Sequence, residues 1–288
     1  MQTLSHDILI IGAGLAGQRA AIEAKNLGMD VGIVSKVHPV RSHSVAAAGG
    51  INASIGTGDD WKKHFHDTVY GSDFLGDQDA IELLCKDAPT RIMEMESWGV
   101  VFSRTNKGDI AQRAFGGQDM PRTCYAADRT GHMLLHTLYD QLMKAAPTVY
   151  SEHYCVRLLM ENNQCHGAVL WDIEKGKLLV ARAKAVLLAT GGYGRAFSMT
   201  SNARINTGDG LALAYNAGLP LEDMEMVQFH PSGMYGKGFL VSEASRGEGA
   251  FLLNGKKERF MKVYAPQKME LASRDVIARA IQTEINHG

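Results

Sequence analysis

The start of the chain alternates between apolar segments and a segment of helix-forming residues. Residues 7–11 form a short apolar run, and the glycine-rich segment 12–17 follows it directly. Residues 18–25 are rich in strong helix formers, and Gly28 stands before a second apolar run at 31–34. This order predicts a strand, a tight turn, a helix and a second strand, which together form a βαβ unit.

The glycine spacing within this unit is typical of a dinucleotide-binding turn. Gly12 permits the turn, Gly14 lets a pyrophosphate approach the backbone, and Gly17 allows the helix to pack closely on the strand. The helix N-terminus then faces the phosphates. A merely structural glycine turn is the alternative, but the flanking strands and helix supply the context that the motif requires. The predicted cofactor-binding residues of the loop are Gly12, Ala13, Gly14, Ala16 and Gly17.

The end of the second strand lacks the acidic residue that usually binds the ribose of a nicotinamide cofactor. Ser35 and Lys36 stand there instead. A hydroxyl can still hydrogen-bond a ribose, and a lysine can contact a phosphate. The sequence therefore favours a dinucleotide other than NAD.

The later pattern predicts mixed α/β structure. Helices are expected over 79–98 and 131–144, and another begins at Asp59-Asp60-Trp61. Residues 154–160 and 167–172 resemble an antiparallel strand pair, and 181–189 predict a further strand that enters a glycine-rich turn. Residues 207–210 open a helix that continues to Ala214, with Asp209 as a candidate cap.

Composition excludes several classes of function. The formal net charge is −1, with both signs interspersed, so nucleic-acid binding is not expected. No apolar run is long enough to cross a bilayer, and no signal peptide is recognisable, which predicts a location in the cytoplasm or an organelle matrix. The four cysteines have no metal-binding or CxxC spacing, so we expect reduced thiols and no metal site.

A series of ordered motifs resembles the flavoprotein subunits of succinate dehydrogenase and quinol:fumarate reductase. The resemblance runs through nearly the whole chain. It rests on Ser35-Lys36, Arg41-Ser42-His43-Ser44, Gly49-Gly50, the segments 67–73 and 76–79, Phe102-Ser103-Arg104, Phe115-Gly116-Gly117-Gln118, Asp128-Arg129-Thr130-Gly131-His132, the segment 207–210, Gln228-Phe229-His230-Pro231, the segment 242–249 and Arg274-Asp275-Val276.

The resemblance implies a Rossmann-like FAD-binding domain over 1–230 and the beginning of an α+β capping domain over 231–288. It also implies that FAD is bonded covalently to His43, and that the turn at 190–194 contacts the flavin, although a plain glycine turn is the alternative. Ala48 replaces the family's glutamine before Gly49, which leaves the fine tuning of the flavin open. The further cofactor-binding residues implied are Ser35, Lys36, Arg41, Ser42, His43, Ser44, Gly49, Gly50 and Asp209.

The same resemblance implies a site for a dicarboxylate, succinate or fumarate. His230 and Ser242, a serine where threonine is more usual, hold one carboxylate, and Phe102 presses on the substrate unless it is a core residue. Arg274 exchanges the proton. Because arginine rarely loses its proton, Glu243 and Arg246 act as a relay to solvent; a surface ion pair is the alternative.

The implied partners are an iron–sulfur protein and, through it, a membrane anchor, which places the chain peripherally on the cytoplasmic or matrix face. The family is about twice as long as 288 residues, so we expect a longer protein. Two alternatives remain: a soluble relative such as L-aspartate oxidase or a fumarate reductase, and a non-catalytic flavin-binding module. L-aspartate oxidase lacks the linking histidine, so His43 argues against it.

Overall fold

The computed structural model describes residues 2–234 and 236–288. Its contacts divide the chain into two compact units, each built from two segments. The first unit comprises Met1–Ala47 and Gly131–Met224, and the second comprises Ala48–Thr130 and Glu225–Gly288. The predicted α/β class is confirmed. The expected domains, 1–230 and 231–288, were implied by the family resemblance, and their boundary stays a prediction.

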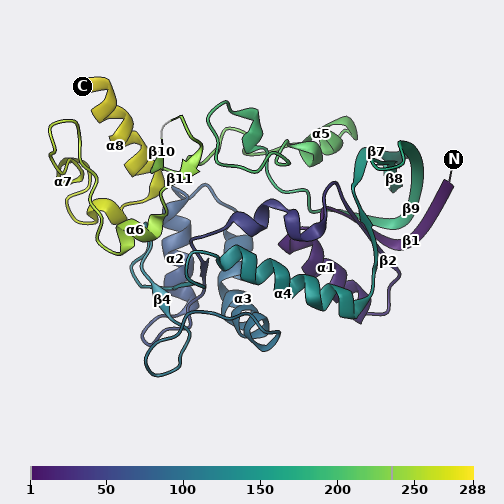
Figure 1. The fold of residues 1–288 in the computed structure, drawn as a ribbon, viewed down its shortest axis with the longest axis horizontal. Helices are drawn as coiled ribbons and strands as arrows, with labels where there is room; N and C mark the ends of the chain where they lie inside the picture. The colour runs from purple at the N-terminus through teal and green to yellow at the C-terminus, as the bar shows by residue number, and fades with distance from the viewer. Residues whose placement is uncertain (1, 235) are drawn as a thin grey trace. The chain divides into compact units, whose positions relative to one another are not determined.

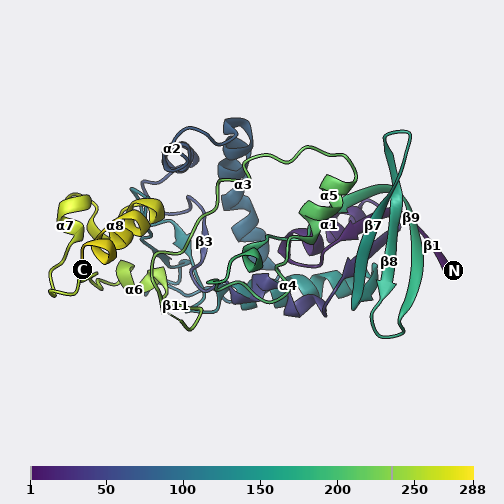
Figure 2. The same ribbon diagram turned by 90° about the horizontal axis from the view of Figure 1, so that it is seen from above.

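A six-stranded sheet is the centre of the first unit, with strand order β6-β2-β1-β9-β8-β7 (Figures 1 and 2). The strands β6, β2, β1 and β9 run parallel, whereas β9, β8 and β7 form an antiparallel meander. The elements of this unit are β1 (Gln2–Ile11), α1 (Leu15–Asn26), β2 (Val31–Ser35), the 3₁₀ turns η1 (Pro39–Arg41) and η2 (His43–Ala46), α4 (Thr130–Ala145), β6 (Thr148–Ser151), β7 (His153–Glu161), β8 (Gln164–Asp172), β9 (Lys177–Leu188), η3 (Gly194–Ala196) and α5 (Asp209–Asn216).

Local sequence explains the main features of this sheet. Leu9, Ile10 and Ile33 are fully buried, as expected for parallel strands covered on both faces. The hairpin between β7 and β8 closes over Asn162 and Asn163, which both have positive φ. Asparagine tolerates that conformation, and a two-residue turn of this kind matches the twist of the strands. The predicted strands and the antiparallel pair are therefore confirmed.

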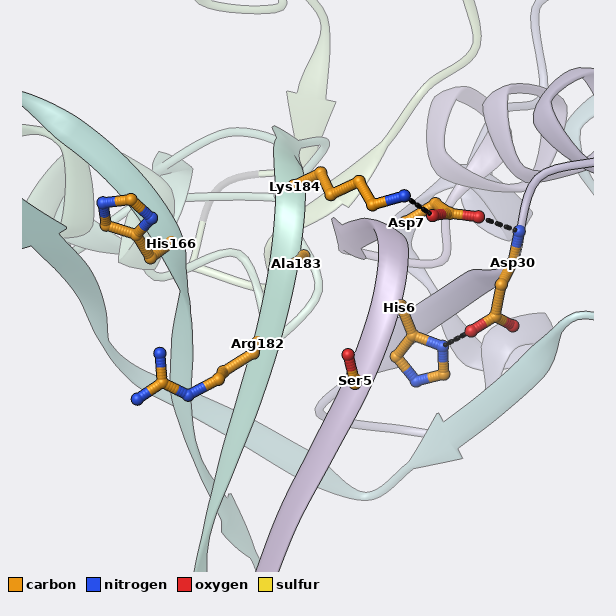
Figure 3. Close-up of a pocket in the computed structure, with 8 residues that line it drawn as sticks. All are labelled: Ser5, His6, Asp7, Asp30, His166, Arg182, Ala183 and Lys184. Atoms are coloured by element: carbon orange, nitrogen blue, oxygen red, sulfur yellow. Dashed lines mark hydrogen bonds and ion pairs between the residues drawn. The ribbon is translucent and has the colours of Figure 1, made fainter.

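A polar cluster surrounds His6 in the middle of β1, away from the glycine loop that follows the strand. The ring of His6 lies against Gly32, with Nδ1 2.9 Å from Asp30 Oδ2 and Nε2 2.8 Å from the Tyr150 hydroxyl. A cavity of about 500 Å³ opens beside His6 and Asp30 (Figure 3). Four of its lining residues are linked: Asp7 pairs with Lys184 and accepts from the backbone of Asp30, whose side chain contacts His6.

The second unit contains a pair of helices and two small antiparallel sheets, one of three strands and one of two. Aspartates cap both paired helices: Asp60 accepts from the backbone of α2, and Asp77 from that of α3. The elements are β3 (Ile51–Asn52), α2 (Trp61–Gly71), α3 (Gln78–Ser97), β4 (Gln112–Arg113), β5 (Thr123–Cys124), β10 (Gly233–Met234), β11 (Phe239–Leu240), α6 (Glu243–Gly247), α7 (Met261–Tyr264), η4 (Met269–Leu271) and α8 (Arg274–His287).

A buried ion cluster and an apolar cluster stabilise the second unit. Arg122 is completely buried between Asp59 and Asp67, and it joins the start of β5 to the loop before α2 and to α2 itself. A separate apolar cluster, which includes Phe260, Met261 and Ile277, packs α7 against α8. This apolar cluster supports the segment that carries Arg274.

The cysteines and the helix lengths agree with the expectations from sequence. All four cysteines are free, and burial raises the pKa of the Cys124 thiol to about 11 and that of Cys155 to about 12. Such thiols stay protonated near neutral pH. Within residues 2–234 and 236–288, no helix is both long and apolar enough to cross a membrane.

Candidate functional site

The glycine loop sits at the carboxyl end of β1, where a nucleotide binds in sheets of this kind. Gly12 donates to Val34 O at 2.8 Å and has a φ of +113°. A Cβ at Gly12 would lie 2.2 Å from Ala189 O, and one at Gly17 would lie 1.8 Å from Gly12 O. Both glycines are therefore required sterically, and the close approach of α1 to the strand depends on them.

The third glycine, Gly14, faces two serine hydroxyls. A Cβ on Gly14 would lie 3.2 Å from Ser44 Oγ and 3.7 Å from Ser42 Oγ. Ser44 Oγ accepts from Leu15 N at 3.4 Å, whereas Ser42 Oγ is buried with no hydrogen-bond partner among the described residues. A helix N-terminus, an absent Cβ and an unsatisfied hydroxyl form a cradle that suits the pyrophosphate of a dinucleotide.

Lys36 and Asp209, predicted separately as cofactor-binding residues, meet in the structure. Lys36 Nζ lies 2.5 Å from Asp209 Oδ2, and Thr207 Oγ1 donates to Asp209 Oδ1 at 2.7 Å. The expectation that Asp209 caps α5 is wrong: Gly208 is the N-cap residue and Asp209 lies in the first turn. The aspartate instead fixes Lys36 beside the buried Ser35 at the end of β2.

His43 is half-buried in the short turn η2, and one of its ring nitrogens has a fixed partner. Ala203 N donates to His43 Nδ1 at 3.2 Å. Because Nδ1 accepts this bond, the proton of the neutral imidazole is on Nε2. Burial lowers the pKa of His43, which favours the neutral ring. Nε2 therefore carries a proton, which it would have to lose before forming a bond to a cofactor. Arg41, two residues earlier, is exposed.

In the second unit, the loop of Ala48, Gly49 and Gly50 is held by an arginine that the sequence did not single out. Arg113 donates to Gly49 O at 2.5 Å, to Ala48 O at 3.3 Å and to Ala127 O at 3.2 Å. Its guanidinium also lies 4.2 Å from the ring centroid of Tyr125. The only signal in the sequence was its position just before the Phe115-Gly116-Gly117-Gln118 motif.

A second group of predicted residues comes together around Arg274, at the start of α8. Arg274 Nε donates to Glu243 Oε2 at 2.7 Å, and Nη1 donates to Gln228 Oε1 at 2.9 Å. Glu243 Oε1 accepts from Gly116 N at 2.8 Å. Gln228 and Gly116 belong to the quoted motifs, yet their roles as partners could not be inferred from sequence. Three other segments of the chain, which carry Gly116, Gln228 and Glu243, thus orient one guanidinium.

Glu243 and Arg246 are buried, which excludes the surface ion pair that the sequence left open. Only 3% of each side chain is exposed, and Arg246 Nη2 lies 3.8 Å from Glu243 Oε2. Burial, opposed by Glu243, lowers the pKa of Arg246. The two residues and Arg274 form a row of alternating charge, in which Arg274 is the most exposed member.

The remaining predicted substrate residues differ in their surroundings. His230 is half-buried; burial and the charge of Arg274 lower its pKa, while its bond to the Ser232 carbonyl acts in the opposite direction. Ser242 is the N-cap of α6, and its hydroxyl accepts from Ala244 N. Phe102 is only 2% exposed, which suits the core interpretation as well as contact with a substrate. Their binding roles stay predictions.

The sequence was compared with known protein families. Residues 7–288 match the family described as "FAD binding domain". The chain belongs to that family. This assignment confirms the fold class and the use of a flavin dinucleotide, and it supplies the cofactor for which the glycine cradle is suited.

Several similar proteins are named succinate dehydrogenase flavoprotein subunits. The chain is 52% identical to a succinate dehydrogenase flavoprotein subunit from Rickettsia bellii, over 98% of this chain and 49% of that protein. It is 49% identical to the mitochondrial succinate dehydrogenase (ubiquinone) flavoprotein subunit of Oryza sativa, over 99% of this chain and 47% of that protein. The chain therefore spans about half the length of the curated relatives it matches.

A solved structure of a related enzyme has the same fold as this chain. The quinol fumarate reductase of E. coli matches with a TM-score of 0.98 and 39% identity, over 100% of this chain and 52% of that one. The resemblance stated from the motifs is thus confirmed at the level of the family. The covalent bond to His43 and the individual site roles are finer statements, and they are argued below as proposals.

Proposed function

We propose that this chain is part of the flavoprotein subunit of a succinate:quinone or quinol:fumarate oxidoreductase, and that it takes part in interconverting succinate and fumarate. The observation that carries this proposal is the Arg274–Glu243 pair at 2.7 Å, backed by the buried Arg246. The printed names of the relatives support it. The direct test is succinate-dependent reduction of an electron-accepting dye by the full-length protein. No succinate or fumarate turnover would refute the proposal.

FAD, when bound, supplies the centre that accepts or gives the hydride, and the chain's own residues move the proton. Arginine is a poor acid because its pKa is high. Glu243 compensates for this: its carboxylate accepts a hydrogen bond from Arg274 Nε, so a proton that Glu243 takes up from the side of Arg246 can pass on to Arg274 over that short distance. Gln228 holds the other side of the guanidinium, so Arg274 keeps one orientation during transfer.

His230 is suited to one carboxylate of the substrate, but only in its protonated form. Nδ1 lies 3.1 Å from Ser232 O, which can only accept, so Nδ1 carries a proton in every state of the ring. Nε2 is then an acceptor in the neutral ring and a donor in the cation. A carboxylate needs the donor, so substrate binding and protonation of His230 support each other.

This tautomer predicts that the KM for succinate rises with pH. The pKa of His230 is below its usual value, so the cation is lost, and its hydrogen bond with it, as the pH rises through that lowered pKa. A charge-assisted hydrogen bond contributes about 1.5–3 kcal/mol, so the rise in KM should be on the order of tenfold or more. The test compares KM–pH profiles of the natural protein and His230→Gln. We expect the variant to have a high, flat KM; the same slope in both proteins would contradict this role.

We infer that His43 bonds FAD through Nε2. The Ala203 N–H occupies Nδ1 and would remain compatible with a ring substituted at Nε2, because Nδ1 keeps its lone pair. The neighbouring Ser42 and Ser44 line the same cradle as Gly14. A covalent bond raises the flavin's reduction potential, which oxidation of a saturated C–C bond requires.

Replacing His43 by serine is expected to abolish the covalent bond while leaving bound FAD. The glycine cradle and the Lys36–Asp209 pair remain, so the variant should contain flavin that is released on denaturation. Intact mass under denaturing conditions measures the difference. His38→Ser is the matched control, because His38 is exposed and lies before the same turn. A natural protein without covalent FAD would overturn the linkage and favour a relative such as L-aspartate oxidase.

The electrons taken up by FAD must leave it one at a time, and an iron–sulfur subunit is the proposed acceptor. Such a partner would in turn connect the protein to a membrane anchor and place it at the cytoplasmic or matrix face. Relatives named as subunits support an assembly of this type. Co-purification with a polypeptide that contains iron and acid-labile sulfide would test it.

A further inference from the structure

The row of buried charge continues past Arg246. Arg246 Nη1 donates to the backbone carbonyl of Glu270, in the turn η4, at 3.0 Å. Its Nε and Nη2 are buried, and among the described residues neither finds a hydrogen-bond acceptor. A buried cation with so few acceptors depends strongly on the charges around it.

Glu270 supplies such a charge, and its carboxylate has its own partner. The side chain is almost fully buried, accepts from Leu252 N at 3.3 Å, and pairs with Arg259 through Nε at 2.9 Å and Nη2 at 2.6 Å. The bonds from Arg259 hold the pKa of Glu270 below its usual value. Glu270 is therefore an anion over the working pH range, and Arg259 partly neutralises it.

The charged and titratable groups that face Arg246 come from each neighbouring element. They are Glu243 on its own helix, Arg274 on α8, Glu270 in η4 and His230 before β10. Glu243 and Glu270 favour the charged guanidinium, whereas Arg274 opposes it. Without Glu270, the Glu243 carboxylate alone would balance the positive charges of Arg246 and Arg274.

We propose that Glu270 is a positioning residue for the proton relay: its carbonyl fixes the Arg246 guanidinium, its carboxylate keeps that group protonated, and Arg259 sets how strongly the carboxylate acts. This role rests on the proposed function, because it requires Arg246 to return protons through Glu243 to Arg274.

The proposal predicts effects of opposite sign for two neighbouring substitutions. Glu270→Gln removes the negative charge but keeps an oxygen that can accept from Arg259 and Leu252. Arg246 then loses its proton at lower pH, and turnover falls earlier on the alkaline side. Arg259→Gln leaves the Glu270 carboxylate without its neutralising partner, so the proton on Arg246 is held more firmly. General loss of structure would move both variants the same way.

The experiment measures kcat for fumarate reduction at about pH 9.5 and about pH 7, and compares the ratio of the two values. For Glu270→Gln we expect this ratio to fall below that of the natural protein, with KM unchanged, because loss of the Glu270 charge lowers the pKa of Arg246 further. For Arg259→Gln the ratio should stay equal or rise. FAD content and melting temperature, measured on the same samples, report whether each variant is folded and loaded.

Glu284→Gln is the matched control. Glu284 also accepts two side-chain hydrogen bonds, from Asn254 and Tyr264, but it has no contact with Arg246. The ratio of kcat at high pH to kcat at neutral pH in Glu284→Gln should equal that of the natural protein. An unchanged ratio in Glu270→Gln, or an equal fall in Arg259→Gln, would overturn the inference. Absence of turnover in the natural protein would instead overturn the proposed function.

Discussion

Replacing Arg274 by lysine is expected to lower turnover of succinate and fumarate about 10²–10⁴-fold, the usual contribution of a positioned acid or base. Arg274 contacts Glu243 and Gln228 through different nitrogens of one planar group. The lysine ammonium is a single point and cannot hold both partners in the same geometry. The proton donor would then be misplaced relative to Glu243, although the charge is conserved.

The measurement is kcat with saturating substrate, together with the FAD content of the same sample. We expect the flavin to be retained, because the residues of the glycine cradle are unchanged. Arg279→Lys is the control: Arg279 lies on the same helix, its side chain is 70% exposed, and among the described residues its one ion pair is with Asp275, one turn away. Full activity in Arg274→Lys, or an equal loss in Arg279→Lys, would remove Arg274 from the proton step.

The elements that could be predicted from sequence are those with local signals. The βαβ unit at the start was recognisable because apolar runs, helix formers and glycines follow one another in order, and the structure has β1, α1 and β2 there. The helix expected over 79–98 is α3, Gln78–Ser97, and Asp77 caps it. A cap and a long helical period are properties of neighbouring residues, so they are readable without the fold.

The missed elements depend on partners far along the chain. β6 is only four residues long, and it is a strand because it pairs with β2, more than a hundred residues earlier. β3, β4 and β5 have two residues each and exist through their mutual pairing. Segments this short carry too few residues for a hydrophobic period.

In the candidate site, too, some residues could be predicted from local sequence and others could not. Motifs identified Arg274, Glu243 and Arg246 by residue type and order, but Gly116, Gln228 and Glu270 contact them only because distant loops meet in the fold. The sequence also suggested an exposed ion pair for Glu243 and Arg246, since charged residues are usually at the surface. Burial is decided by the whole fold, so that alternative could be rejected only with the structure.

The burial of Arg122 likewise could not be inferred from the sequence. Replacing Arg122 by methionine should destabilise the protein by about 3–5 kcal/mol. Arg122 is 0% exposed; it donates to both carboxylate oxygens of Asp59 at 3.0 Å and lies 2.5 Å from Asp67 Oδ2. Methionine fills much of the space but leaves two buried carboxylates without their cation. Denaturant unfolding of the FAD-loaded protein measures the loss, and Arg91→Met, at a partly exposed helical pair, should cost less than about 1 kcal/mol.

Removing the carboxylate charges as well distinguishes a loss of pairing from a loss of packing. Asp59→Asn and Asp67→Asn, added to Arg122→Met, eliminate both uncompensated anions while keeping the shape of the side chains. Because the cost of breaking a buried pair comes mainly from the charge left behind, the triple variant should be more stable than Arg122→Met alone. A triple variant that is no more stable would mean that Arg122 acts through its volume, and the buried ion pairs would then contribute little to holding β5 and α2 together.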